Sequence, residues 1–150
     1  MLKVGEKAPP FDVETTKGER LSLESLAGKY VVLYFFPKAF TAGCTLETKG
    51  FQSHYAEVAE LGAEVVGVST DGMQTQCNFA DKYGVEFPMI ADSDRAVSKA
   101  YKATRMLIPF NKRVTYVIDP AGRIAAAFDY EVRAAKHVDE ALAFIRRVAA

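Results

Sequence analysis

The stretch Tyr30-Val-Val-Leu-Tyr-Phe-Phe36 decides the fold, and Pro37 follows it directly. Seven apolar or aromatic residues in a row, with no charge among them, predict a strand buried on both faces at the centre of a sheet. Proline has no N–H group to give to a sheet, so the strand ends at Pro37. Thr41 then offers a hydroxyl as a helix cap, and apolar residues at helical spacing continue to Leu61. We therefore expect a buried strand that leads directly into a helix.

This arrangement puts Cys44 in the first turn of the expected helix, at the carboxyl end of the central strand. Ligands and chemistry gather at this end of the sheet in α/β proteins. The thiolate is the reactive form of cysteine, and a helix N-terminus favours it through unpaired N–H groups and about half a positive charge. The Thr41 hydroxyl could donate a hydrogen bond to the sulfur or to a substrate oxygen. The alternative is structural, because free cysteine often packs as a small buried hydrophobe.

The pattern Pro37-x-x-x-Thr41-x-x-Cys44 resembles the active-site motif of the peroxiredoxins. The fuller stretch is similar to the bacterioferritin comigratory protein (PrxQ-like) subfamily, and the further matching residues are Gly43, Thr45 and Glu47. That subfamily usually has proline before the glycine, where this chain has Ala42, a change that loosens the first turn but spares the chemistry. The resemblance implies a thiol peroxidase in which Cys44 attacks hydrogen peroxide or an organic hydroperoxide and becomes a sulfenic acid.

A second match is the stretch Arg113-Val-Thr-Tyr-Val-Ile-Asp119, which resembles the strand that carries the active-site arginine of the peroxiredoxins. By this resemblance Arg113 stabilises the Cys44 thiolate, and Glu47 helps to hold Arg113. Arginine suits this role because it keeps its charge and presents a fixed fork of N–H donors. Both residues also have a plainer interpretation. An arginine at a strand end normally lies in solvent, and the helix dipole alone favours an acidic residue in a first turn.

Cys77 is the open question, because a sulfenic acid must be resolved by another thiol. Many PrxQ-like proteins carry the resolving cysteine on the Cys44 helix, where this chain has Lys49, and some members resolve from the next helix, where Cys77 lies. The resemblance thus makes Cys77 a candidate for an intramolecular disulfide with Cys44, reduced by thioredoxin or a similar dithiol. Such a bond needs Cα atoms within roughly 7 Å, so one end of the helix must unwind, and Gly50 would ease that opening. The alternatives are a one-Cys peroxidase with an external resolving thiol, or a non-enzymatic redox sensor.

The rest of the chain alternates strands and helices. We expect strands over 63–69, 87–92, 113–118 and 123–128 and helices over 73–83, 94–101 and 136–148. This order predicts crossover connections, parallel pairing of the central strands and a hairpin at Asp119–Gly122, with the loop 102–112 near the site. The layout fits a thioredoxin-like fold. We expect one α/β domain over residues 1–150, with a central mixed sheet flanked by helices, an N-terminal extension, and a C-terminal hairpin plus helix.

Charge and composition narrow the partners. Lys plus Arg and Asp plus Glu number 19 each, with no basic cluster, which argues against nucleic acid and anionic membrane. No run approaches membrane-spanning length, and the first residues are too charged for a signal peptide, so we expect a cytoplasmic protein. No motif for heme, flavin or nicotinamide is present, and neither His54 nor His137 stands at a spacing that makes a metal site with a cysteine. These two histidines are interpreted as surface or packing residues. The PrxQ-like resemblance implies a monomer.

Overall fold

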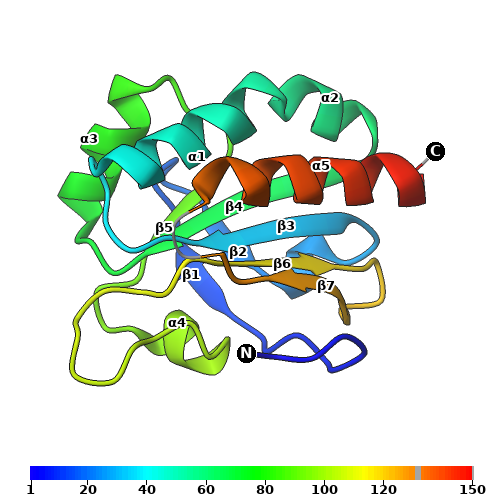
Figure 1. The fold of residues 1–150 in the computed structure, drawn as a ribbon, viewed down its shortest axis with the longest axis horizontal. Coiled ribbons are helices and arrows are strands. Elements are labelled where there is room, and N and C mark those ends of the chain that lie inside the picture. Colours follow the sequence, from blue (N-terminus) through cyan, green and yellow to red (C-terminus); the bar gives the residue numbers. More distant parts are fainter. Residues whose placement is uncertain (131–132, 150) are drawn as a thin grey trace.

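The centre of the protein is a five-stranded sheet in the order β5-β4-β3-β6-β7 (Figure 1). The structure is a computed structural model that describes residues 1–130 and 133–149. The strands are β3 (Tyr30–Phe35), β4 (Ala63–Ser69), β5 (Met89–Ala91), β6 (Val114–Ile118) and β7 (Ile124–Phe128). Strand β3 pairs parallel with β4 and antiparallel with β6, so the sheet is mixed, as the sequence predicts.

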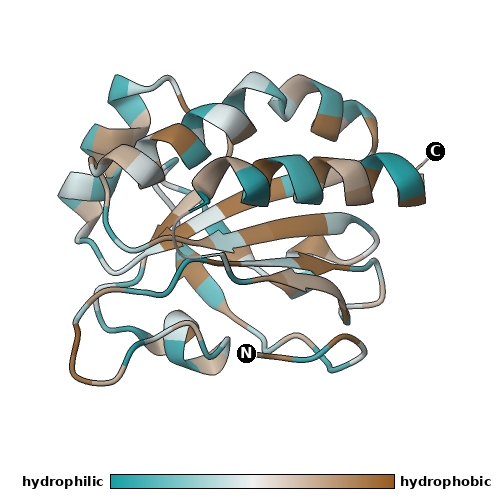
Figure 2. Cartoon of the chain, viewed as in Figure 1, coloured by the Kyte–Doolittle hydropathy of each residue, from teal (hydrophilic) through white to brown (hydrophobic). Residues whose placement is uncertain are grey.

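Strand β3 is buried on both faces because its side chains alternate between two apolar cores. Val32 and Tyr34 point into the core under α1 and α5, whereas Val31 and Leu33 point into the core on the opposite face. All four side chains are at most 1% exposed. In Figure 2 the strands at the centre of the sheet are mostly hydrophobic, whereas the helices mix hydrophilic and hydrophobic residues along their length. The apolar run of the sequence therefore becomes the middle of the molecule.

Helices cover the two faces of the sheet unequally. Helices α1 (Ala42–Ser53), α2 (Tyr55–Glu60), α3 (Met73–Lys82) and α5 (Ala134–Ala149) lie on one face, while α4 (Ala96–Ala100) and the N-terminal segment lie on the other (Figure 1). A separate hairpin is formed by β1 (Asp12–Glu14) and β2 (Arg20–Ser22), followed by the short 3-10 helix η1 (Glu24–Leu26). Helices α1 and α5 pack closely at Gly50, where an added Cβ would lie 3.0 Å from a methyl carbon of Val138.

Two expected helices differ from the observed ones. The predicted helix that runs to Leu61 stops at Ser53 and restarts at Tyr55. Its break is local. The carbonyl oxygen of Gly50 accepts the Ser53 hydroxyl and lies 3.0 Å from Nδ1 of His54, and the His54 N–H bonds to Phe51 instead. Side-chain competition of this kind interrupts a helix.

The helix expected from residue 94 begins later. Arg95 has a left-handed backbone with φ of 63°, so α4 starts at Ala96. The carboxylate of Asp92 accepts the N–H groups of Val97 and Ser98, which gives the first turn of α4 its hydrogen-bond partners. This helix therefore starts two residues into the predicted range, and the Asp92 side chain satisfies the backbone N–H groups of its first turn.

Candidate active site

A short loop between β3 and α1 places Cys44 at the end of the central strand. The Ala39 N–H donates to Oδ2 of Asp71, at 2.8 Å, and the Ser69 hydroxyl donates to the same oxygen, at 2.7 Å. Asp71 follows β4, the parallel neighbour of β3, so the two strand ends are tied together. Phe40 has φ of 67°, a left-handed conformation that costs a non-glycine residue roughly 1–2 kcal/mol. The loop thus reverses the chain tightly before α1 begins.

Cys44 is the third residue of α1 and is fully buried, with 0% exposure. N–H groups in a first helical turn have no partner inside the helix and point toward the N-terminus. The Nη2 group of Arg113 lies 3.6 Å from the Cys44 sulfur. This sulfur therefore lies where backbone donors and a guanidinium converge, and both favour a negative charge there.

Gly43 makes room for that guanidinium. A Cβ added at this position would lie 2.8 Å from Nη2 of Arg113, which is closer than real Cβ contacts. The glycine next to the cysteine is therefore required by the close approach of Arg113, and not by an unusual backbone angle. Sequence reasoning used Gly43 only as part of a motif, and the structure supplies its physical reason.

Thr41 occupies the N-cap position of α1, but its hydroxyl does not cap the helix. The hydroxyl donates to the carbonyl oxygen of Lys38, at 2.7 Å. The predicted side-chain cap is therefore wrong, because the tight loop offers a nearer acceptor. The Thr41 carbonyl still accepts the first helical bond, from Thr45. Thr41 remains exposed beside the first turn, whereas Pro37 is half-buried and lies two residues after the last residue of β3.

Arg113 is held by Glu47, one turn after Cys44 on the same helix. Nη1 of Arg113 donates to Oε1 of Glu47 at 2.8 Å, and both side chains are buried. Burial raises the pKa of Glu47 to about 8, although Arg113 acts in the opposite direction. Burial lowers the pKa of Arg113, but Glu47 and Cys44 more than offset this, so its pKa is raised and its charge is secure. The pair orients one guanidinium nitrogen toward the carboxylate and another toward the sulfur.

His137 is the site residue that sequence reasoning did not find. It lies on α5 with 0% exposure, its Nδ1 atom 2.8 Å from the Thr115 hydroxyl and its Nε2 atom 2.7 Å from the carbonyl oxygen of Tyr130. Nδ1 is also 3.8 Å from Oε2 of Glu47. Burial lowers the pKa of His137. The available signal was its place on the apolar face of the C-terminal helix, four residues before Ala141.

Cys77 lies apart from Cys44 in the reduced protein. Cys44 belongs to the core that includes Phe36 and Ala80, whereas the sulfur of Cys77 contacts the carbonyl oxygen of Thr16 at 3.8 Å. Both cysteines are free, and Cys77 is only half-buried. Ala80 lies on the same helix as Cys77 and packs into the core that contains Cys44. Helix α3 therefore presents Ala80, and not Cys77, to that core. The structure does not bring the two cysteines together.

The expected loop 102–112 does lie beside the site. The Thr70 hydroxyl donates to the carbonyl oxygen of Pro109, at 3.0 Å, and the Lys38 ammonium lies 5.4 Å from the centre of the Phe110 ring. Several apolar side chains of this region are exposed. They are Phe40, Met106, Leu107, Ile108 and Phe110. The exposed surface of these loops is therefore largely apolar, with Lys38 beside the Phe110 ring.

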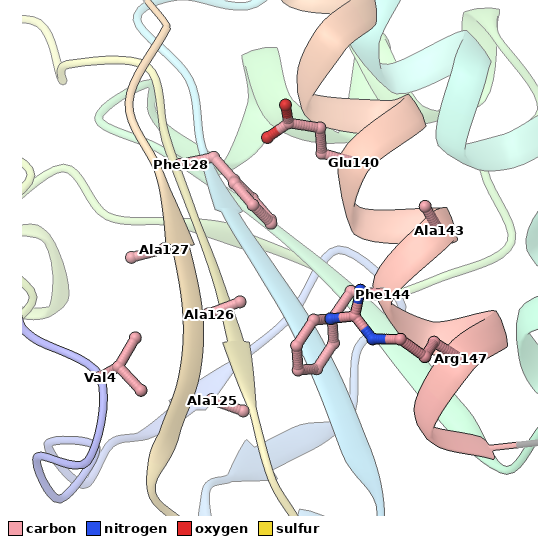
Figure 3. A pocket seen from close by; sticks show the side chains of 9 residues that line it. All are labelled: Val4, Ala125, Ala126, Ala127, Phe128, Glu140, Ala143, Phe144 and Arg147. Atoms are coloured by element: carbon pink, nitrogen blue, oxygen red, sulfur yellow. The ribbon is translucent and has the colours of Figure 1, made fainter.

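A cavity of about 430 Å³ lies elsewhere, between β7 and α5 (Figure 3). Its walls include Phe128, Phe144 and Arg147, and neither Cys44 nor Arg113 lines it. Within residues 1–130 and 133–149, no group of three or more His, Cys, Asp or Glu side chains could hold a metal ion. No helix in this part of the chain is long and apolar enough to cross a membrane.

Comparison with known proteins gives the family. The AhpC/TSA family matches residues 4–127. The chain is 33% identical over 147 residues to peroxiredoxin Bcp of Bacillus subtilis, covering 94% of this chain and 93% of that protein. A crystal structure of peroxidoxin BcpB from Mycobacterium tuberculosis superposes with a TM-score of 0.91 at 32% identity, covering 99% of each chain.

A second solved structure is the bacterioferritin comigratory protein of Xanthomonas campestris, described in connection with its alkyl peroxide reduction activity. It superposes with a TM-score of 0.86 at 29% identity, covering 93% of this chain and 92% of that one. The core described above is thus the thioredoxin-like core of these proteins. The chain belongs to the AhpC/TSA family and, within it, to the bacterioferritin comigratory protein (PrxQ-like) peroxiredoxins, which are peroxidase enzymes.

Proposed function

We propose that this chain reduces hydrogen peroxide and organic hydroperoxides with Cys44 as the nucleophile. The observation that carries the proposal is the contact of 3.6 Å between the Arg113 guanidinium and the buried Cys44 sulfur in the first turn of α1. In the reaction the thiolate sulfur forms a bond to one peroxide oxygen and the O–O bond breaks. Cys44 becomes a sulfenic acid, and the leaving alkoxide or hydroxide takes up a proton to give an alcohol or water.

The surrounding groups suit the charge that develops in this step. Arg113 and the backbone N–H groups at the start of α1 are donors for the peroxide oxygens, and preorganised donors of this kind stabilise a leaving oxygen. The Thr41 hydroxyl can accept a hydrogen bond from a hydroperoxide O–H, and it can donate to a peroxide oxygen once it turns away from the Lys38 carbonyl. Glu47 positions Arg113 through their 2.8 Å ion pair. Pro37, two residues after β3, has no N–H group, so sheet pairing cannot continue into the loop to Cys44. The exposed apolar side chains of Phe40 and Phe110 favour organic hydroperoxides as substrates.

The second half of the cycle is proposed to use Cys77. A condensation of the Cys44 sulfenic acid with the Cys77 thiol forms a disulfide and releases water, and thioredoxin or a similar dithiol then reduces that disulfide. Cys77 contacts Thr16 in the reduced protein, so α3 or the first turn of α1 must unwind beforehand. Gly50 packs against Val138 in the middle of α1, which supports an opening at the first turn of α1 in place of one at Gly50.

The test is peroxide consumption with thioredoxin and its reductase, for wild type, Cys44→Ser and Cys77→Ser. The proposal predicts turnover in wild type, none in Cys44→Ser, and a stall after a single turnover in Cys77→Ser. Normal cycling of Cys77→Ser would show a one-Cys peroxidase with an external resolving thiol. A wild type that is oxidised once at Cys44 and never turns over, with several hydroperoxides and dithiols, would favour the redox sensor.

We further propose that the chain acts as a monomeric single domain in the cytoplasm. Both cysteines are free. The cytoplasm keeps thiols reduced, and an enzyme that is recycled by a dithiol works in such a reducing compartment. Light scattering of the reduced protein tests the monomer, for which a mass of 16.5 kDa is expected. A stable mass of twice that value would contradict it.

A further inference from the structure

Four groups that carry or exchange charge are buried together beneath the first turn of α1. Cys44, Glu47 and His137 have 0% exposure, and Arg113 has 6%. They form a chain of contacts: Cys44 to Arg113 at 3.6 Å, Arg113 to Glu47 at 2.8 Å, and Glu47 to His137 at 3.8 Å. The peroxidase step needs Cys44 as a thiolate, so the charge of the whole group decides how readily that thiolate forms.

Charge balance makes this group sensitive to one proton. With a Cys44 thiolate, an ionised Glu47 and a neutral His137, the positive charge of Arg113 faces two negative charges within this group of four residues. A net charge without a partner is costly in a buried site. The balance is restored if one proton stays within the group, and arginine cannot exchange it. Glu47 is the acceptor next to both Arg113 and His137.

The carboxylate oxygen Oε2 of Glu47 can hold that proton. Within the part of the chain that the structure describes, Oε2 of Glu47 is buried and has no hydrogen-bond partner. The nearest imidazole nitrogen is Nδ1 of His137, at 3.8 Å, so the two side chains must approach by roughly 1 Å before a proton on Oε2 can bond to it. Nε2 lies against the Tyr130 carbonyl oxygen, which can only accept, so Nε2 carries the hydrogen of the neutral ring and Nδ1 carries a lone pair. The Thr115 hydroxyl now uses this lone pair, and a hydroxyl can rotate away from it.

We propose that Glu47 holds the proton that Cys44 gives up on ionisation, and that His137 is a positioning residue which stabilises it on Oε2 by accepting a hydrogen bond at Nδ1. This inference deepens the proposed function and rests on it for its meaning in catalysis. The proton stays in the group while Cys44 is a thiolate. Oxidation of Cys44 to the neutral sulfenic acid removes the negative charge, and the proton is released. This release balances the proton that the leaving alkoxide takes up.

Several elements bring titratable or charged groups to the Glu47–His137 pair. Among the described residues they are Cys44 from α1, Tyr34 from β3, Arg113 next to β6, Asp129 and Tyr130 before α5, and Glu140 on α5. Tyr34 stays protonated, because burial raises its pKa well above the ordinary value. Burial likewise raises the pKa of Glu47 and lowers that of His137, so a proton in this group belongs on the carboxyl and not on the imidazole.

The experiment is a pH titration of thiolate absorbance at 240 nm, without any peroxide. The full chain carries Cys77→Ser, so that Cys44 is the one thiol present, and the same chain with Cys44→Ser supplies the baseline. The variants are His137→Phe, which removes the acceptor, His137→Gln, whose amide oxygen can replace it, and Glu47→Gln, which cannot hold the proton. His54→Gln, at the end of α1, is the matched histidine control. Circular dichroism establishes which variants are folded.

His137→Phe and Glu47→Gln should shift the thiolate in opposite directions. In His137→Phe the midpoint of thiolate formation rises by about one pH unit, a tenfold loss of thiolate on the acid side. In Glu47→Gln the midpoint falls, because Arg113 then faces one negative charge. His137→Gln stays within threefold of wild type, and His54→Gln is unchanged. In the Glu47→Gln background, adding His137→Phe has no further effect on the midpoint.

A structural role alone would raise the midpoint in both variants, through a loosened Arg113, and that result overturns the proposal. A folded His137→Gln that titrates like His137→Phe also overturns it. If His137→Phe does not fold, Glu47→Gln decides alone, since a raised midpoint there contradicts the charge balance. These outcomes do not depend on turnover. A wild type without peroxidase activity would remove the proposed function and leave the thiolate result standing.

Discussion

Substitution of Gly43 by alanine should separate the activity of this protein from its stability. The added Cβ would lie 2.8 Å from Nη2 of Arg113, and an ordinary contact begins at 3.4 Å. The guanidinium must therefore retreat by at least about 0.6 Å, the difference between these two distances. Its contact with the Cys44 sulfur is already long, at 3.6 Å, so this retreat weakens or breaks it. A hydrogen bond to a charged group contributes about 1.5–3 kcal/mol, which corresponds to a loss of roughly 10- to 150-fold.

The fold should tolerate the same change. Gly43 is the second residue of α1 and has no left-handed backbone angle, and alanine is favoured over glycine within a helix by up to about 1 kcal/mol. Only the end of a flexible side chain has to move. We expect an unchanged or slightly raised melting temperature together with a second-order rate constant for peroxide reduction that falls at least tenfold.

The assay is stopped-flow oxidation of the reduced protein by hydrogen peroxide. Gly72→Ala is the matched control, because a Cβ at this glycine before α3 has no heavy atom within 4 Å. The control should react like wild type. A Gly43→Ala protein that reacts within twofold of wild type would refute the assignment of Arg113 to the Cys44 sulfur. A large fall in melting temperature would instead show that Gly43 is needed for folding.

Three other predictions concern Arg113, Gly50 and His137. Arg113→Lys keeps the charge but loses the fork that reaches Glu47 and Cys44 together, so the same stopped-flow rate should fall at least tenfold, and an unchanged rate would contradict the two-pronged contact. Gly50→Ala places a Cβ 3.0 Å from Val138, and the cost of overpacking outweighs the gain in helix propensity. Urea denaturation should therefore show a free energy of unfolding that is lower by about 1 kcal/mol. A stabilised variant would contradict this packing. The depressed pKa of His137 means that the unfolded chain binds the proton more tightly, so stability is retained above its ordinary pKa of 6.5 and falls as the pH drops below it. His137→Gln should flatten that acid-side loss, measured by urea denaturation at pH 7.5 and 5.5, and a parallel loss in both proteins would contradict it.

Local pattern was enough to predict the centre of the fold. The charge-free run at Tyr30 to Phe36 has no polar face to present to water, so both of its faces must be buried. In the structure its side chains are divided between two cores. The hairpin at Asp119–Gly122 also follows from local chemistry, because proline and glycine suit a tight turn there and the Gly122 N–H bonds back to Asp119. Both features depend on neighbours in sequence, and both were predicted.

Features that depend on residues far apart in sequence were not predictable. His137 lies 90 residues after Glu47, and nothing local shows that α5 brings its imidazole to that carboxylate. The Thr41 hydroxyl turned to the Lys38 carbonyl because the loop is tighter than the sequence indicates. The direction of Cys77 follows from how α3 rotates against the sheet, and its Thr16 contact spans 61 residues. The spacing of apolar residues predicts a helix but does not fix the helix's exact rotation about its axis. The direction of side chains at the edge of the buried face is therefore not predicted.

Mass spectrometry of the oxidised thiol shows directly whether Cys44 receives the peroxide oxygen. Reduced Cys77→Ser protein is treated with one equivalent of hydrogen peroxide in the presence of dimedone, which traps sulfenic acids. We predict a single dimedone adduct on Cys44, formed within seconds and at least tenfold more slowly in a protein that also carries Arg113→Ala. No adduct on Cys44, or equally fast labelling without Arg113, would contradict it.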